Sequence, residues 1–571
     1  MYSGKHRERS AIAILIMVTL VATLLVAAAP AAAEVKKYHG TVVSCQTDEP
    51  KTLNPCWSMD SGNEIAAAAI YSRLVSLDGG GVAYPDLADS WENTPDFKTF
   101  TFHLHKGVKW HDGTPFTSAD VKFTYDTIIA KQYPGVAYLK NVEEISCPDD
   151  LTVVVKFSQA NVAFVPMLAL GGNWYLQILP KHYLGDEDWK SGPHINQPMG
   201  TGPFKFVEWV QGSHITMEAN KDFFMGAPYV DKLVIRFIPD AQVAFQAFKS
   251  GELTHLPYDY VPPYKEIAEL QKDPSMRVIN GFWLYGSNLS FNTKKAPFGD
   301  PRVRRAIAMA IDRDAINRLA FNNTWTPSIW AGIPAVSEYL NKNATYPAYD
   351  VEAAKKLLDE AGLKANADGV RLECTITAPP YEYDHLICES VVEQLRQIGI
   401  KLTWNKYDWE TWFTKLKAGD FDLSIDYMRY APDPNNYYDL YHSQGSRNFK
   451  GIANAELDSL LEAGKVEIDI PKRHEIYNRV QEILVTEIAD VVLFNQTHVE
   501  LLQKNWHGSI YEEEAHNKAL SWMGFYAFYR DAPEEGAAAG GSSTATLWYV
   551  IMGIAVVAVV LFFVLRKRGK K

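Results

Sequence analysis

Long apolar runs lie near both ends of this chain, and short apolar segments alternate with polar ones between them. The first run, Ala11–Ala29, follows Lys5, Arg7 and Arg9 and ends in Pro-Ala-Ala-Ala. A basic start, an apolar middle and a small-residue exit are typical of a secretory signal peptide. We therefore predict a signal peptide over residues 1–33, and the length of the run leaves an uncleaved signal anchor as an alternative.

The second run, Leu547–Leu565, is unbroken. About 20 apolar residues in a helix span a hydrocarbon core roughly 30 Å thick. Trp548 and Tyr549 suit one membrane interface, and the basic tail 566–571 is expected on the cytoplasmic side. The pattern predicts a single transmembrane helix over 547–565 in the cell membrane. It places the preceding chain outside the cell or in the periplasm.

Strand and helix patterns alternate between these ends. Phe100, Phe102 and Leu104 fall on one face of an alternating segment and are predicted to face the core of a sheet. Thr117 is predicted to cap a following helix, because Asp120 stands at the third helical position, where it can complete a capping box.

Two later helices are predicted to begin after aspartates. The helix that follows Asp300 places an apolar stripe of Val303, Ala306, Ile307, Ala310 and Ile311 toward the core, with Arg304 and Arg305 facing away. The helix after Asp350 is predicted to end at Gly362. This mixture indicates an α/β class, and 571 residues exceed what one core usually supports. We expect two lobes.

Charge and cysteine content limit the functions and the disulfide pairs that are possible. The chain has a net charge of −12; because the two basic termini together carry +7, the region between them carries −19. Such an acidic region would be repelled by phosphate backbones, so we expect no nucleic-acid partner. The five cysteines allow the local pairs Cys45–Cys56 and Cys374–Cys388, leaving Cys147 over, but spacing does not fix their connectivity.

Catalytic and metal-binding motifs are not found, so we predict no catalytic residue, no metal site and no cofactor. His103 and His105 share a strand face, but two ligands do not make a metal site. His111–Asp112 precedes Gly-Thr-Pro and is interpreted as part of a turn. Aromatic residues are the remaining signal: Trp409, Trp412 and Phe413 share a helical face, which core packing also explains. A Pro- and Asn-containing loop after Tyr427 carries further rings and is a candidate for ligand contact.

Several long segments resemble the family 5 solute-binding proteins of ABC importers, the peptide/nickel type. They are ADSWE at 88–92, FTFHLHKGVKWHDGTPFTSADVKFTYD at 100–126, MGTGPFKF at 199–206, IPDAQVAFQAFKSGEL at 238–253, FNTKKAPFGDPRVRRAIAMAIDRDAI at 291–316, YDVEAAKKLLDEAG at 349–362 and PDPNNYYDLY at 432–441. They occur in the order of the family and cover roughly residues 38–530.

The resemblance implies a two-lobe periplasmic-binding-protein fold, type II-like, with an extra subdomain in the first lobe. The implied boundaries are 34–75, 197–285 and 505–530 for lobe I, 76–196 for its subdomain, 286–504 for lobe II, and 531–546 for a flexible linker. The implied function is a membrane-anchored, monomeric receptor that traps an oligopeptide or similar small solute in the cleft between its lobes, delivers it to the permease subunits of an ABC importer, and is not an enzyme.

The implied ligand contacts are Trp404, Trp409, Tyr427, Arg429, Tyr430 and Asp433 from lobe II, with Trp57 from lobe I. In peptide-binding relatives an aspartate pairs with the ammonium group of the peptide, whereas Tyr430 stands at the matching position here. This difference leaves an oligosaccharide as an alternative ligand. A surface glycan-active enzyme, and a sensor or adhesion protein that works without a permease, are the other readings of the sequence.

Overall fold

The computed structural model describes residues 40–57, 61–77, 82–172, 175–257, 260, 264–332, 337–429, 431, 433–509 and 528–530. The predicted signal peptide, linker, transmembrane helix and basic tail lie outside these residues. Within them, no helix combines the length and the apolar composition that crossing a bilayer requires.

The first lobe contains two four-stranded sheets. One has the order β1 (Thr41–Gln46), β10 (Lys232–Phe237), β9 (His214–Ala219), β8 (Phe204–Val210), and the other the order β4 (Ala88–Asn93), β5 (Thr99–Leu104), β7 (Thr152–Phe157), β6 (Val142–Asp149). The remaining elements of this lobe are α2 (Ser61–Ile70), the pair β2 (Val75–Leu77) and β3 (Ala83–Pro85), α3 (Ser118–Lys131), η1 (Pro134–Leu139), α4 (Phe164–Gly172), α5 (Lys181–Leu184) and α6 (Ala241–Lys249). The next helix, α7 (Tyr264–Leu270), packs Tyr264 and Ile267 into the core of the second lobe. The second of the two sheets is antiparallel throughout.

Local sequence signals in this lobe behave as predicted. Phe100, Phe102 and Leu104 of β5 are buried in its core. Thr117 caps α3, and its backbone N–H donates to Asp120 Oδ2 over 3.0 Å. Alternation and capping depend on neighbouring residues alone, which is why the sequence could specify both.

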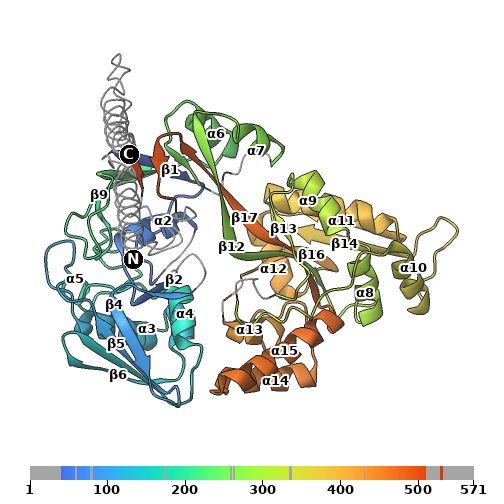
Figure 1. Ribbon diagram of the computed structural model, residues 1–571, viewed down its shortest axis with the longest axis horizontal. Coiled ribbons are helices and arrows are strands. Elements are labelled where there is room, and N and C mark those ends of the chain that lie inside the picture. The colour runs from blue at the N-terminus through green and yellow to red at the C-terminus, as the bar shows by residue number, and fades with distance from the viewer. Residues whose placement is uncertain are drawn as a thin grey trace, which may run out of the picture. The chain divides into compact units, whose positions relative to one another are not determined.

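One seven-stranded sheet connects the two lobes. Its order is β11 (His255–Leu256), β17 (Asp490–Gln503), β12 (Met276–Phe291), β16 (Leu423–Arg429), β14 (Leu372–Ala378), β15 (Ile400–Lys406), and β13 (Thr326–Pro327) also pairs with β17. The long antiparallel strands β12 and β17 run side by side (Figure 1). At one end β17 pairs with β11 of the first lobe. Further along, β12 pairs with β16 of the second lobe. Their pairing is interrupted between Phe282 and Gly286, where the register shifts.

Helices surround the second-lobe part of this sheet. They are α8 (Pro301–Met309), α9 (Arg313–Ala320), α10 (Val351–Glu360), α11 (Glu382–Arg396), α12 (Trp409–Ala418), η3 (Pro434–Asn436), α13 (Tyr437–Tyr441), α14 (Ala455–Val466) and α15 (Ile470–Glu487). A short pair, β18 (Trp506–His507) with β19 (Tyr529–Arg530), follows β17. As predicted, Asp350 caps α10 by accepting from Ala353 N–H, and Gly362 follows the helix with a positive φ of 88°.

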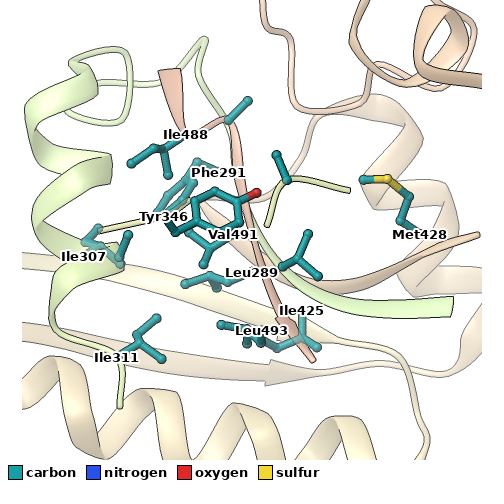
Figure 2. Close-up of a cluster of buried hydrophobic side chains, with 14 of the residues drawn as sticks. Leu289, Phe291, Ile307, Ile311, Tyr346, Ile425, Met428, Ile488, Val491 and Leu493 are labelled. Carbon is teal, nitrogen blue, oxygen red and sulfur yellow. The ribbon is translucent and has the colours of Figure 1, made fainter. Parts of the chain in front are cut away.

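The buried apolar residues collect in separate cores. A core that contains β5 and β10 lies in the first lobe, and another that contains β12, β16, β17 and α8 lies in the second. Figure 2 shows Leu289 and Phe291 of β12 packed with Ile307 of α8, Ile425 of β16 and Val491 of β17. The predicted α/β class and the two-lobe arrangement are thereby confirmed.

The prediction for Arg304 is wrong. The apolar stripe of α8 is buried as expected, but so is Arg304, which is 3% exposed. Its guanidinium donates to the backbone carbonyls of Glu487 and Ile488 at the end of α15 and forms an ion pair with Glu487 at 3.2 Å. Carbonyls at a helix C-terminus lack partners inside the helix, so an arginine from another helix can satisfy them.

None of the five cysteines, all of which are described, is joined in a disulfide. Neither local pair is therefore linked. Cys56 and Cys388 are buried, and burial raises the pKa of the Cys388 thiol above its ordinary value. A buried thiol packs like a small apolar side chain, and these two residues belong to the apolar cores.

Candidate ligand-binding site

The candidate site is built on α12, which follows the edge strand β15. Asp408 begins the helix by accepting from the Thr411 N–H. Spacings of three and four residues then place Trp409, Trp412 and Phe413 along one face. Gly419 ends the helix in the left-handed conformation. Local chemistry thus fixes a short helix with an aromatic face.

A pocket of about 140 Å³ opens between α12, strands β12 and β16, and the segment 447–450. Its walls are the rings of Trp409, Trp412, Phe413, Tyr427 and Phe449. Trp409 stacks on Tyr427 with ring centroids 5.8 Å apart, and on Phe413 at 5.7 Å. A hydrogen bond holds the Trp412 ring in position: its indole N–H donates to Ser424 Oγ over 3.3 Å.

The floor of the pocket is polar. Asn288 of β12 and Asp426 of β16 are directly opposite each other in the sheet. Asn288 is fully buried, and neither its amide oxygen nor its amide nitrogen has a hydrogen-bond partner. Asp426 Oδ2 accepts from Ser290 Oγ over 2.8 Å, while its Oδ1 has no partner. Burial raises the pKa of the Asp426 carboxyl to about 6, against the opposing charge of Lys450.

Two cations also line the pocket. Lys450 is buried and pairs with Asp490, their Nζ and Oδ2 atoms being 2.8 Å apart. Arg447 is exposed at the rim, where its charge lowers the pKa of the Asp426 carboxyl. Asp426 is the one carboxylate that lines the pocket, and Asp490, the partner of Lys450, supplies a second beside it, so these four groups together carry no net charge when all are ionised.

The pocket lies near one end of β16. Register places Ser287 opposite Tyr427 and Gly286 opposite Met428, next to the irregular section of β12. Just beyond β16, Ala431 packs in the apolar core of the first lobe. The end of β16 that carries the pocket is therefore the end nearest the first lobe.

The predicted site residues are partly brought together. Trp409 and Tyr427 both line the pocket. Trp404 on β15 is not among its lining residues; Lys406 Nζ lies 3.9 Å from its ring centroid and His385 packs against it. Trp57 belongs to the first lobe, where Lys190 Nζ lies 4.4 Å above its ring. Tyr430 and the side chain of Arg429 lie outside the described residues.

Asp433 has another role in the described structure. It is buried, and both of its carboxylate oxygens accept from the Arg473 guanidinium at 2.7 and 2.8 Å. It also caps η3 by accepting from the Asn435 N–H. Its carboxylate is thus already paired with a buried cation inside lobe II.

Sequence reasoning missed the polar floor and its cations. A polar residue in an otherwise apolar strand was the available signal: Asn288 lies in SNLSF and Asp426 in LSIDYM. Neither segment shows that the two residues face each other, because that depends on how β12 and β16 pair. Arg447 and Lys450 carried no signal in the sequence.

The histidine pairs that sequence analysis set aside have structural neighbours. His105 lies 2.7 Å from Asp89 and His103 lies 3.8 Å from Glu92. His111 is hydrogen-bonded through Nε2 to the Gly202 carbonyl, and burial lowers its pKa to about 4. Among the described residues, no group of three or more His, Cys, Asp or Glu side chains could hold a metal ion.

Comparison with known proteins gives a consistent result. Residues 82–449 match the family described as bacterial extracellular solute-binding proteins, family 5. The dipeptide-binding protein of Escherichia coli is 26% identical over 507 residues, which cover 82% of this chain and 92% of that protein.

Solved structures are similar over most of the chain. The oligopeptide-binding protein AppA from Bacillus subtilis, in complex with a nonapeptide, has a TM-score of 0.71 at 25% identity and covers 87% of this chain and 100% of that one. AgaA from A. tumefaciens, in complex with agropinic acid, has a TM-score of 0.70 at 27% identity and covers 87% of this chain and 99% of that one. Proteins of this fold therefore bind ligands of different chemistry.

Proposed function

This chain belongs to the bacterial extracellular solute-binding proteins of family 5, and on that premise we propose that it captures short peptides outside the cell and delivers them to an ABC importer. Proteins of this group that resemble it are binding receptors rather than enzymes. The peptides named for two of its relatives support a peptide as its ligand.

The observation that carries the proposal is the aromatic pocket beside the crossing strands. A concave, mostly apolar site with a few convergent polar groups is the usual form of a small-molecule site. Here Trp409 and Tyr427 supply the flat walls, while Asn288 and Asp426 supply unpaired polar atoms.

Capture requires the lobes to respond to the ligand. We infer boundaries at 285/286 and 504/505, so that the chain passes between lobes I and II within β12 and again just after β17. Because two strands connect the lobes, bending at them can close one lobe on the other. A ligand that contacts both lobes binds the closed state better and shifts the population toward it. The permease would then recognise the closed, loaded receptor.

We assign the predicted contacts accordingly. Trp409 and Tyr427 contact the ligand from lobe II, and Arg429 and Tyr430 are proposed as further contacts from the same lobe. Trp57 contacts it from lobe I, and Trp404 contributes at the margin of the site. Asp433, whose carboxylate is paired with Arg473, holds the loop in place instead.

The proposed receptor is anchored by its C-terminus. A helix over 547–565 would hold the folded body on a linker of residues 531–546, and its reach of about 20 Å keeps the receptor close to the permease. Tethering raises the effective concentration of one partner near the other. Membrane fractionation tests this: the full chain should sediment with membranes, whereas a chain that ends at residue 532 should be released in soluble form. Sedimentation of both would contradict the anchor.

Calorimetry on the full-length protein in detergent tests the ligand. Dipeptides, tripeptides and longer peptides are compared with oligosaccharides, after mass spectrometry of any solute that co-purifies.

We expect peptide binding that Trp409→Ala weakens at least tenfold, since stacking and burial of one ring are worth more than about 1.4 kcal/mol. Trp91→Ala on β4 removes a comparable half-buried ring from the first lobe and should leave affinity unchanged. If Trp409→Ala left peptide affinity unchanged, the pocket would not be part of the peptide-binding site.

A second candidate ligand is an oligosaccharide. The flat faces of rings such as Trp409 and Tyr427 suit the apolar face of a sugar ring. Tyr430 stands where an aspartate would pair with a peptide ammonium, which supports the same alternative. Saccharide binding without peptide binding in the calorimetric panel would establish this candidate and reject the first.

A further inference from the structure

We propose that the lobe II pocket selects a ligand ring that carries a hydroxyl group, and that its occupant is the tyrosyl side chain of a bound peptide. This inference rests on the proposed function, because it specifies which peptides the receptor prefers. Three properties of the pocket lead to it: its volume, the unpaired atoms of its floor and its balanced charge.

The volume fits one six-membered ring. The pocket measures about 140 Å³, and a cavity of about 150 Å³ lined by apolar side chains accepts a benzene molecule. Trp409, Phe413 and Tyr427 line it with rings that are nearly parallel: Trp409 lies at 12° to each of the other two. A flat ligand ring can pack beside such surfaces in offset stacking.

The floor needs both a donor and an acceptor from the ligand. Asp426 Oδ1 can accept a hydrogen bond, and Asn288 can accept one through Oδ1 and donate one through Nδ2. A phenol hydroxyl can donate to Asp426 and accept from Asn288 at the same time. A ring without a hydroxyl would leave these buried atoms without a partner, so we expect it to bind about tenfold or more weakly.

Charge argues against a charged side chain in the same place. Lys450 is already paired with Asp490 at 2.8 Å, and Arg447 at the rim offsets Asp426. An ammonium or carboxylate group that entered the pocket would lose its water. Every charge in the pocket already has an opposite charge nearby, so none is left over to pair with the ligand group. A neutral polar tip meets the hydrogen-bonding needs of the floor without that desolvation cost.

The test is a comparison of tripeptides that differ by one oxygen atom. Binding of Ala-Tyr-Ala and Ala-Phe-Ala, and of the matching pairs with the ring at the first or third position, is measured calorimetrically on the full-length protein. We expect at least one position at which the tyrosyl peptide binds about tenfold or more tightly, as one buried unpaired group implies.

Variants of the floor residues test whether they cause the preference for the tyrosyl peptide. Asn288→Leu should bring the ratio of tyrosyl to phenylalanyl affinity close to one while the phenylalanyl peptide still binds. Asn93→Leu makes the same change on β4 of the first lobe and should keep the preference. If Asn288→Leu lowers the melting temperature too far for calorimetry, Asp426→Asn alters the floor with little change of shape and should reduce the same ratio.

The outcomes separate this inference from the function that it specifies. Tyrosyl and phenylalanyl peptides that bind equally well at every position would overturn the hydroxyl preference and leave peptide capture intact, the floor being satisfied by water. If no peptide binds, both proposals are rejected. A tyrosyl preference that survives Asn288→Leu and Asp426→Asn would show that another part of the receptor reads the hydroxyl.

Discussion

At the scale of the residue, the second lobe holds polar groups whose surroundings differ sharply. Asp433 is buried with both oxygens paired to Arg473. Asp384, in the first turn of α11, is fully buried and neither carboxylate oxygen has a hydrogen-bond partner. Burial, and next the charge of Asp426, raises the pKa of the Asp384 carboxyl well above its ordinary value. Burial alone therefore does not show whether a carboxyl stabilises the folded protein. Its hydrogen-bond and ion-pair partners decide that.

Asp384→Asn is expected to stabilise the protein at neutral pH. A carboxyl ionises near pH 4 in the unfolded chain but resists ionisation in the folded one, so its stabilising contribution is complete below about pH 4 and is lost as the pH rises toward the folded pKa. Asparagine has no such loss. Denaturant unfolding should show a gain of more than about 1 kcal/mol at pH 7.5 that shrinks toward pH 4.

The matched control is Asp368→Asn, in an exposed loop. It should leave the free energy of unfolding nearly the same at both pH values. A stability difference for Asp384→Asn that does not change with pH would mean that this carboxyl keeps an ordinary pKa in the folded protein.

At the scale of the element, contacts between helices depend on a few buried arginines. Arg473 of α15 donates to the Gly464 carbonyl in α14 and to Asp433 at the start of η3, and so joins three elements. Arg304 similarly joins α8 to the end of α15. Helical periodicity predicted the apolar face of α8 but assigned Arg304 to the surface. A periodic pattern does not show which neighbour supplies carbonyls to a guanidinium.

Arg473→Met is expected to destabilise the second lobe strongly. It leaves the Asp433 carboxylate buried without its cation, which costs about 3–5 kcal/mol in comparable pairs. Arg479→Met on the same helix is the control, because Arg479 and Glu456 form an exposed pair at 2.7 Å and such pairs are worth about 0.2–1 kcal/mol. Urea unfolding measures both, and similar costs for the two variants would show that the buried pair adds no net stability.

At the scale of the whole molecule, two long strands connect two separate cores. β12 and β17 pair along most of their length, with an irregular section that ends where the pocket begins. Most buried apolar residues on either side pack within their own core, and Ala431, just beyond β16, is an exception that packs into the core of the first lobe. Because the strands are shared while the cores are separate, each lobe can remain intact while the connection between them bends.

Ligand binding is therefore expected to reduce the radius of gyration. Small-angle scattering of the full-length protein, with the detergent contrast-matched, should show a more compact form when saturating peptide is added. Trp409→Ala should need a higher peptide concentration for the same change, since it weakens binding without altering the strands. A radius of gyration unchanged at saturation would contradict capture by closure.

The sequence by itself determined the local features of this protein. The alternation in β5, the caps at Thr117 and Asp350, and the aromatic face of α12 each depend on residues a few positions apart, and the structure contains all of them. The order of the family segments likewise determined the fold and the two lobes.

Only the tertiary structure decided which side chains meet. Asn288 and Asp426 form one floor because β12 and β16 pair in a particular register, and a shift of one residue would turn one of them to the opposite face. That register is fixed by packing between segments far apart in the chain. Short-range patterns record how each strand is buried but not which strand lies beside it, so the pocket could not be predicted from them.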